Sequence, residues 1–340
     1  MLHQRLLQRF NIEEDELDNA FRKLPQLEEI CFGPGFRYLP HTVKPITPEL
    51  FSPLGREMLV EPGHYDGLNY HVGQFTAMMA AAHKTKKRLK VIRALDLPWK
   101  AFEQHLEVLA MMTADMRYCE HFAVKVSGTE ALKGAEVQIS SMIQNAPDLQ
   151  TIELKFLTRV YERPVKAVEL SRLFIYQVHW PNLKSLLLQG FSTSEVHLKE
   201  ILAAHAASLQ SLEISQINLK SYESKGKVHH SSWVKIILFL RESLNLHKMR
   251  FLDSLTNEGN ENWRVREPVI AYDSGTPPVR EDLTFKSRVE RYVVEGGEFP
   301  LPWPTEIEDS RWRDLLLEFR PKLDETWEFH DDVSWFWPYE

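Results

Sequence analysis

One apolar phrase recurs along this sequence, and its spacing limits the possible folds more than any other feature. Its clearest copies have the form Leu-x-x-Leu-x-Leu-x-x-Leu, with Ile, Ala or Phe at some of the positions. Full or looser copies begin at Leu27, Leu89, Cys119, Leu149, Leu183, Leu209 and Leu246. The intervals between these first positions are 62, 30, 30, 34, 26 and 37 residues. The first interval is twice as long as the next, so one unit there is degenerate or is replaced by an insertion.

Each phrase is preceded by a segment whose apolar residues follow helical spacing. Ser192 and Glu195 form a predicted capping box for the clearest of these segments, and Asn11 is the predicted N-cap of the first. The predicted helical faces are Leu17, Phe21 and Leu24; Val72, Phe75, Met78, Met79 and Ala82; Phe102, Leu106 and Leu109; Ile139, Met142, Ile143 and Ala146; Leu198, Ile201 and Leu202; and Trp233, Ile236, Ile237, Leu240 and Leu244. A short strand and one helix, repeated about every thirty residues, is typical of leucine-rich repeats.

The repeat therefore predicts an α/β fold, a leucine-rich-repeat-like solenoid of short parallel strands and outer helices. The second and third apolar positions of the phrase alternate, so they point to one side of a strand and into the core. One unit cannot bury its apolar face alone, so neighbouring units must stack. The alternative is an irregular α/β protein whose strand–helix units match by chance.

The solenoid is expected over residues 1–255, with an irregular insertion at about 33–70 that contains six prolines and five glycines. Residues 256–285 are polar and contain Pro277-Pro278, which predicts a loop or linker. An acidic, Trp-rich C-terminal cap is expected to follow within 256–340, with a helix around 312–317 and the apolar ending WFWPY. An acidic aromatic docking surface for a basic partner is the alternative for this last segment.

Composition excludes several classes of protein. The chain is 43% hydrophobic and 26% charged, which fits a folded globular protein, and no apolar run is long enough to cross a membrane. Residues 291–340 hold five basic and thirteen acidic residues, a net charge of −8, so the rest of the chain is nearly neutral although the whole chain carries −7. This balance argues against nucleic-acid binding through phosphate contacts.

The two cysteines and the N-terminal residues indicate in which cellular compartment the protein is expected. Cys31 and Cys119 lie in separate apolar phrases, which predicts two buried free thiols and a reducing environment. The first residues lack the apolar core and the small-residue cleavage site of a secretory signal. We therefore expect a cytoplasmic or nuclear protein, and a monomer.

No motif of known catalytic spacing occurs, so the chain is expected to be no enzyme and to bind no cofactor or metal. His197 and His205 are expected on one face of a helix, but no third ligand stands at a metal-like spacing. The lysines of KTKKRLKVIR are expected at a solvated helix end. A hydrolase-like site in the loop of His64 and Asp66 stays open as an alternative.

The strand residues between the buried positions are expected on the concave side of the solenoid. This candidate face comprises Arg93, Leu95, His121, Lys125, Thr151, Glu153, Lys155, Ser185, Leu187, Gln189, Ser211, Glu213, Ser215, Lys248 and Arg250. It mixes both signs of charge with exposed-looking leucines. Such a surface suits a protein ligand, because charge sets the orientation and apolar anchors supply affinity.

Several phrases resemble one family, the fungal F-box proteins with divergent leucine-rich-repeat-like C-terminal regions. The resemblance rests on WPNLKSLLLQGF, SEVHLKEILAAHAASLQSLEI, SSWVKIILFLRESLNLHKMRF and RVERYVVEGGEFPL, with ALDLPWKAFE and REMLVEPGHYDG, and covers most of residues 20–300. It implies a substrate receptor of a cullin–RING ubiquitin ligase, in which an F-box binds a Skp adaptor and the repeats hold the substrate.

The F-box itself is not visible in this chain. The only similar string, LPQLEEI from Leu24, is part of the first repeat. Either an F-box lies upstream of Met1 or the protein has none, and a Skp adaptor is an expected partner only in the first case. From the residues alone we expect a non-catalytic protein-interaction module, with a hydrolase-like enzyme or a purely structural scaffold as alternatives.

Overall fold

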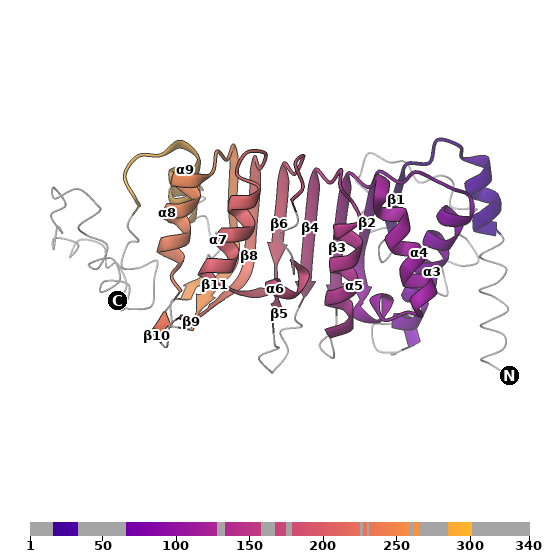
Figure 1. The fold of residues 1–340 in the computed structure, drawn as a ribbon, viewed down its shortest axis with the longest axis horizontal. Helices are drawn as coiled ribbons and strands as arrows, with labels where there is room; N and C mark the ends of the chain where they lie inside the picture. The colour runs from indigo at the N-terminus through magenta and orange to yellow at the C-terminus, as the bar shows by residue number, and fades with distance from the viewer. Residues whose placement is uncertain are drawn as a thin grey trace, which may run out of the picture.

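The computed structural model describes residues 16–32, 66–127, 133–157, 167–174, 179–224, 227–229, 231–258, 262–264 and 285–300. These residues form an α/β fold in which the helices lie along one side of a largely parallel sheet (Figure 1). The strands of the sheet follow one another in chain order, so each unit lies beside the unit before it. This arrangement is compatible with a solenoid.

The sheet is built from the apolar phrases of the sequence. Its order is β1 (Glu29–Phe32), β2 (Val91–Pro98), β3 (His121–Ser127), β4 (Thr151–Leu157), β6 (Ser185–Gln189), β8 (Ser211–Lys220), β11 (Lys248–Asn257) and β12 (Asn262–Arg264). The short strands β5 (Val168–Glu169) and β7 (Phe191–Ser194) join it through β8, and β9 (Tyr222–Ser224) pairs with β10 (Lys227–His229) in a separate hairpin. Neighbours along the main order are parallel, except that β12 runs antiparallel to β11.

Every connection between successive parallel strands of the main order contains a helix. The helical elements are α3 (Asp66–Lys84), η3 (Trp99–Phe102), α4 (Leu106–Asp115), η4 (Met116–Tyr118), α5 (Lys133–Gln144), α6 (Leu170–Leu173), α7 (Glu195–Ala204), α8 (Trp233–Ser243) and α9 (Phe285–Glu295). A further helical segment covers residues 16–23. The described helices cover one side of the sheet. The strand residues that alternate with the buried positions face the other side.

The apolar phrases pair in register across the sheet. Their second apolar positions form one row, Ile30, Ile92, Phe122, Ile152, Leu186, Leu212 and Met249. Every residue in this row is buried. The prediction that these phrases are equivalent parallel strands is therefore confirmed.

A backbone hydrogen-bond pattern also repeats where each strand begins. The carbonyl of Glu28 accepts hydrogen bonds from the amides of Lys90 and Val91, at 2.8 and 3.0 Å. The carbonyls of Lys90, Glu120, Gln150, Lys184 and Gln210 each accept the same two bonds from the next unit. One carbonyl accepts hydrogen bonds from two amides at each junction. These repeated bonds keep the starts of neighbouring strands in register.

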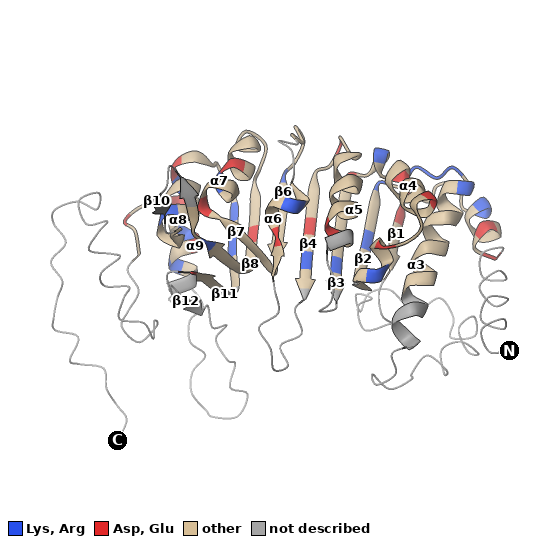
Figure 2. Ribbon diagram, turned by 60° about the horizontal axis from the view of Figure 1, so that its bottom comes forward, with Lys and Arg blue, Asp and Glu red and all other residues tan. Residues whose placement is uncertain are grey.

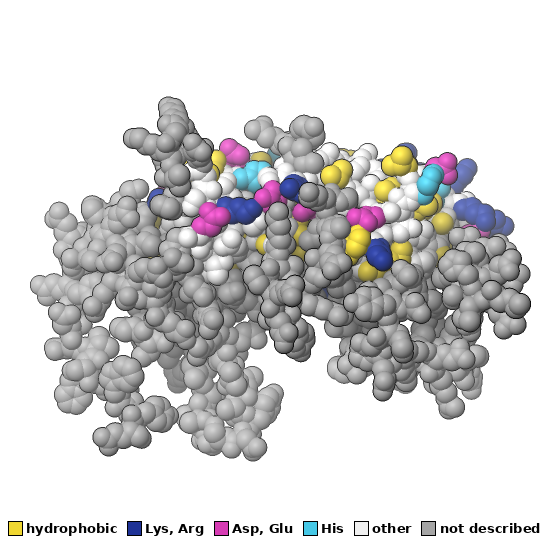
Figure 3. Space-filling model, turned by 90° about the horizontal axis from the view of Figure 1, so that it is seen from below, with side chains coloured by type: hydrophobic (Ala, Val, Ile, Leu, Met, Phe, Trp, Pro, Cys, Tyr) yellow, Lys and Arg dark blue, Asp and Glu magenta, His cyan; other side chains and the backbone are white. Residues whose placement is uncertain are grey.

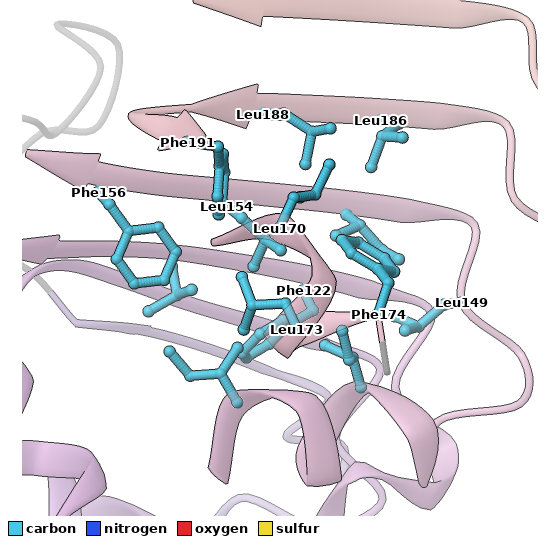
Figure 4. Packing of buried hydrophobic residues seen from close by; sticks show 14 of the residues in the cluster. Phe122, Leu149, Leu154, Phe156, Leu170, Leu173, Phe174, Leu186, Leu188 and Phe191 are labelled. Atoms are coloured by element: carbon cyan, nitrogen blue, oxygen red, sulfur yellow. The ribbon is translucent and has the colours of Figure 1, made fainter. Parts of the chain in front are cut away.

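The core lies between the sheet and the helices. The first residues of the central phrases, such as Leu149 and Leu183, are fully buried. Figure 4 shows side chains of β3, β4 and β6 facing Leu170 and Leu173 of α6. The rings of Phe156 and Phe191 meet edge to face with centroids 5.1 Å apart. The buried residues of all the described units form one continuous cluster.

The predicted helices are confirmed in part. All the predicted core residues of α5 and α8 are buried. The predicted run from Phe102 to Leu109 is wrong, because the chain first makes the 3₁₀ turn η3 and Leu106 at the start of α4 is 79% exposed. Met112 and Met116 supply the buried contacts there instead.

The capping box predicted at Ser192 is also displaced. Ser194 is the N-cap of α7, and its hydroxyl accepts a hydrogen bond from the amide of His197 at 3.2 Å. Ser192 is buried in β7, because the chain runs extended through Phe191–Ser194 before it turns into the helix. The Glu195 carboxylate accepts from the amide of Ser232 instead of closing a box with Ser192.

In the described sheet, no strand lies between the two phrases that flank the long first interval. β1 and β2 are direct neighbours, with Glu29 opposite Val91 and Phe32 opposite Ala94. The first part of the predicted insertion, residues 33–65, lies outside the described residues, and the rest forms the beginning of α3. The predicted N-cap Asn11 also lies outside them.

The polar loop predicted from residue 256 contains strand residues of the sheet. β11 continues to Asn257 and pairs with β12, where a loop was expected. Helix α9 packs against α8 and β11, and its residues Val289 and Val293 belong to the common core. The predicted cap around 312–317 and the ending WFWPY lie outside the described residues.

Among the helices that the structure describes, none combines the length and the hydropathy that crossing a membrane requires.

Candidate protein-binding face

The candidate site is the side of the sheet opposite the helices, which we call the open face. It consists of the side chains that alternate with the buried rows of β1, β2, β3, β4, β6, β8 and β11. Its described residues are Glu29, Cys31, Val91, Arg93, Leu95, His121, Ala123, Lys125, Thr151, Glu153, Lys155, Ser185, Leu187, Gln189, Ser211, Glu213, Lys248, Arg250 and Leu252. Figure 2 shows both basic and acidic positions on these strands.

The register brings most of the predicted site residues together. Arg93, Lys248 and Arg250 are exposed, whereas Leu95, His121, Lys125, Thr151, Glu153, Lys155, Ser185, Gln189, Ser211 and Glu213 are half-buried. One row runs through His121, Thr151, Ser185, Ser211 and Lys248, each opposite the next. The strands thus supply a continuous surface whose side chains come from every described unit.

Ser215 is a wrong prediction, because it is buried at 1% exposure. The next residue, Gln216, has a φ of 48°, which is a left-handed conformation. This residue breaks the regular alternation, so Ile214 and Ser215 are both buried. The backbone carbonyl of Ser215 accepts a hydrogen bond from Gly190 at 3.1 Å, which ties the irregular point to the neighbouring strand.

Leu187 is less accessible than the sequence suggested. It is 9% exposed and lies between Glu153 and Glu213 in the register of the sheet. The predicted apolar anchor at this position is therefore largely covered by its neighbours. Leu95 on β2 remains half-buried.

Ion pairs join acidic and basic residues of the open face. Arg93 contacts Glu29 at 3.0 Å, Lys155 contacts Glu153 at 3.3 Å, and Arg250 lies 3.7 Å from Glu213. Their side chains are partly exposed to solvent, so each pair adds little to stability. The pairs instead fix the positions of charged groups on the surface.

Cys31 is an open-face residue that was not predicted from the sequence. Both cysteines are free thiols, but only Cys119 is buried, and burial raises its pKa to about 12. Cys31 is exposed and lies opposite Arg93. Its place between the buried residues Ile30 and Phe32 is the signal that could have assigned it to this face.

His197 and His205 do not form a shared site. Helix α7 ends at Ala204, so His205 caps it from outside the helix. His205 is buried and stacks on Trp180 with ring centroids 5.4 Å apart. Burial lowers the pKa of both histidines. The two histidines therefore lie in different environments and make separate structural contacts.

A network of ion pairs joins units far apart in sequence. Arg172 of α6 contacts Glu136 of α5 at 3.1 Å and Glu169 at 3.3 Å. Lys220 at the end of β8 also pairs with Glu169 and lowers its pKa. Burial raises the pKa of Glu136, although Arg172 acts in the opposite direction. The network positions the short α6 segment and lies apart from the open face.

The basic run after α3 makes structural contacts. Lys84 pairs with Asp18, the Lys87 ammonium donates to the carbonyl of Leu24 at 2.7 Å, and Arg88 lies over the ring of Tyr118. These contacts fasten the N-terminal helical segment to α3. They agree with the prediction of a helix end and give no sign of a nucleic-acid patch.

The residues proposed for a hydrolase-like site cannot be assembled from the described part of the chain. His64 lies outside the described residues, and Asp66 is the first residue of α3. Within the described ranges, no three His, Cys, Asp or Glu side chains are grouped as metal ligands. Seen from below in Figure 3, the described surface mixes apolar, acidic, basic and histidine side chains.

No protein-family model matches this chain, and comparison with curated proteins finds none of similar sequence.

Proposed function

We propose that this chain is a leucine-rich-repeat-like solenoid that acts as a non-catalytic protein-binding module through its open face. The observation that carries the proposal is the row of in-register strands, which places side chains of all the described units on the side of the sheet that the described helices do not cover. Solenoids use such extended surfaces to hold other macromolecules.

The chemistry of the open face favours a protein partner. It combines paired charges with polar side chains such as Thr151 and Gln189 and with the aliphatic side chain of Leu95. Fixed charges of both signs discriminate between partners, and aliphatic contacts contribute affinity. A face dominated by one charge or by one apolar cleft would fit other ligands better.

The resemblance to the F-box family extends this proposal to a substrate receptor of a cullin–RING ubiquitin ligase. In that role the open face holds the substrate, and a Skp adaptor binds through an F-box outside the residues visible here. The protein would then act as a monomer in the cytoplasm or the nucleus. The binding role of the face does not depend on this extension.

A quantitative pull-down tests the binding role. The double variant Arg93→Glu with Lys155→Glu reverses two charges of the open face, at positions 50% and 29% exposed. We expect specific proteins retained by the wild-type chain to be reduced about tenfold or more with this variant, because each reversal replaces attraction by repulsion. Mass spectrometry measures retention and also reports whether a Skp adaptor is present.

The matched control is Lys23→Glu with Lys100→Glu, which reverses two exposed charges outside the open face. It should retain the same proteins as the wild type. Thermal unfolding of all three chains shows whether the variants remain folded. Equal retention by the face variant and the wild type, or equal loss in the control, would contradict the proposed function.

A further inference from the structure

Five strands of the sheet begin with polar side chains that lie in one row on the open face. In register order, this polar row is His121 on β3, Thr151 on β4, Ser185 on β6, Ser211 on β8 and Lys248 on β11. Neighbouring strands lie about 4.8 Å apart, so the row is about 19 Å long. Its first four members are half-buried, and Lys248 is exposed.

The hydroxyl groups in the middle of the polar row have no structural task. The backbone amides of Thr151, Ser185 and Ser211 donate to carbonyls of the preceding units at 3.1, 3.0 and 2.9 Å. Their hydroxyls, in contrast, make no hydrogen bond within the part of the chain that the structure describes. The strands therefore hold three adjacent hydroxyls in position while leaving their donor and acceptor capacity unused.

Lys248 adds a cation at one end of the polar row. Its register neighbour on β8 is the neutral Ser211, and it forms no ion pair with any described residue. The nearby charges are already committed, because Glu213 lies 3.7 Å from Arg250. An exposed ammonium of this kind attracts and orients an anionic group of a ligand.

We propose that the polar row binds an extended segment of a partner protein that crosses the strands, with an acidic side chain of that segment on Lys248. This inference rests on the proposed binding function and specifies how the partner is held. An extended chain rises about 3.3 Å per residue, so about six residues span the row. The hydroxyls of Thr151, Ser185 and Ser211 contact its backbone, because every peptide unit offers a donor and an acceptor.

A peptide fits the polar row better than a nucleic acid does. Glu153 and Glu213 stand two residues beyond Thr151 and Ser211 on the same strands and would repel a continuous phosphate backbone. The hydroxyl positions are neutral, so a polyanion gains a charge contact only at Lys248. A peptide can place one acidic residue there and neutral residues along the rest of the row.

Selection from a displayed library of random dodecapeptides on the full chain tests the charge contact. We expect the retained peptides to carry Asp or Glu near one end about three times as often as the input library, because Lys248 rewards an acid at one end of the row only. The variant Lys248→Gln should select peptides without this enrichment. The control Lys23→Gln removes an exposed charge outside the open face and should keep it.

Fluorescence polarisation with the most enriched peptide tests the backbone contact. Ser185→Ala with Ser211→Ala should raise its Kd about tenfold, because two hydrogen bonds to the partner are lost. Thermal unfolding should not change, since these hydroxyls bond to no described residue. The same peptide with N-methylated central amides should bind the wild type more weakly, and this penalty should be smaller in the serine variant.

The matched control is Ser141→Ala with Ser243→Ala, which removes two hydroxyls from α5 and α8 on the helical side of the sheet. Its Kd should equal that of the wild type. A library that yields no retained peptide, retained peptides without acidic enrichment, or an unchanged Kd in the face variant would each overturn the inference. Tighter binding of a labelled DNA single strand than of the selected peptide, with loss in Lys248→Gln, would assign the row to nucleic acid instead.

The serine variant separates this inference from the proposed function. In the pull-down, proteins lost with Arg93→Glu and Lys155→Glu but fully retained by Ser185→Ala with Ser211→Ala would support the binding face and refute the polar row. Loss with both variants, together with the peptide results, supports both. Retention by both variants refutes the function and the inference together.

Discussion

At the scale of single residues, His205 shows how a polar side chain can be part of the core. Its Nε2 accepts a hydrogen bond from the amide of Trp180 at 3.2 Å, so its Nδ1 carries the proton and donates to the carbonyl of Ile201 at 2.8 Å. The neutral ring thus satisfies two backbone groups. The His179 ring also stacks on His205, with centroids 5.7 Å apart, and besides burial it helps to lower the pKa of His205.

Acid should destabilise the protein through His205. Burial lowers its pKa, so the unfolded chain binds this proton at higher pH than the folded chain does. Stability is therefore complete above the ordinary histidine pKa of about 6.5 and falls as the pH drops below it. Urea unfolding measured between pH 8 and pH 5 checks this direction.

His205→Gln is the variant for this test, because an amide can donate and accept but does not titrate. We expect a loss of about 1–3 kcal/mol at pH 8 from poorer stacking and hydrogen bonding. The difference from the wild type should shrink as the pH falls. The other histidines affect both proteins alike, so they do not change this difference. A difference in unfolding free energy that stays constant from pH 8 to pH 5 would show that His205 does not cause the acid sensitivity.

The wrong prediction at Ser215 has a cause in the local backbone conformation. Strict alternation assigns every second strand residue to one face, and this rule placed Arg93, Glu153 and Arg250 correctly. It failed at Ser215, where the left-handed Gln216 follows. A positive φ at a non-glycine residue depends on the surrounding packing, so the sequence gives no reliable sign of it.

At the scale of elements, α9 closes one end of the sheet. The Glu290 carboxylate accepts a hydrogen bond from the amide of Phe251 on β11 at 2.6 Å. Arg241 of α8 donates to the carbonyls of Val293 and Val294 at the end of α9. The helix thereby satisfies an amide of β11 at a position that β12 does not pair with, and its own last carbonyls are satisfied in turn.

Removing the Glu290 carboxylate should loosen this end. Glu290→Ala is expected to cost about 1–3 kcal/mol, because the amide of Phe251 loses a charged acceptor. Glu290→Gln keeps an oxygen acceptor and should lose less. Urea unfolding measures the cost, and hydrogen exchange at Phe251 locates it.

Glu298→Ala, at an exposed position after the same helix, is the matched control and should change stability little. If Glu290→Ala and Glu298→Ala behave alike, the carboxylate does not secure the edge. Faster exchange confined to β11 and α9 would support the described contact.

Helix prediction succeeded where the apolar residues kept a regular helical spacing over three turns. The stripes of α5 and α8 each pack on the neighbouring strands and were predicted correctly. Helix α9 was missed, although the four-residue spacing of Val289 and Val293 is a helical signal. The short segments β5 and α6 were missed because two to four residues carry no measurable periodicity.

At the scale of the whole molecule, the repeated units share one core. Leu212 on β8 is fully buried and lies in register between Leu186 on β6 and Met249 on β11. Its side chain therefore contributes to three adjacent units. Contacts in a stacked array are made mainly between neighbours, so damage should remain local.

Leu212→Ala should lower stability by about 2–5 kcal/mol, because it leaves a cavity in the core. Hydrogen exchange should accelerate mostly in β6, β8 and β11 and much less in β2. Val196→Ala, at a site 39% exposed on α7, is the control and should have a small effect. An equal acceleration in β2 and β8 would contradict a stacked array of units.

The sequence by itself determined the repeated strands, their buried rows and the chain-order stacking, because each apolar phrase must be covered by its neighbours. It also placed most of the open-face residues. Only the tertiary structure decided that Ser215 is buried and that α9 closes the sheet. The physical reason is that spacing reports which side of a strand a residue takes. Register, local φ angles and contacts between distant segments arise only when the units pack together.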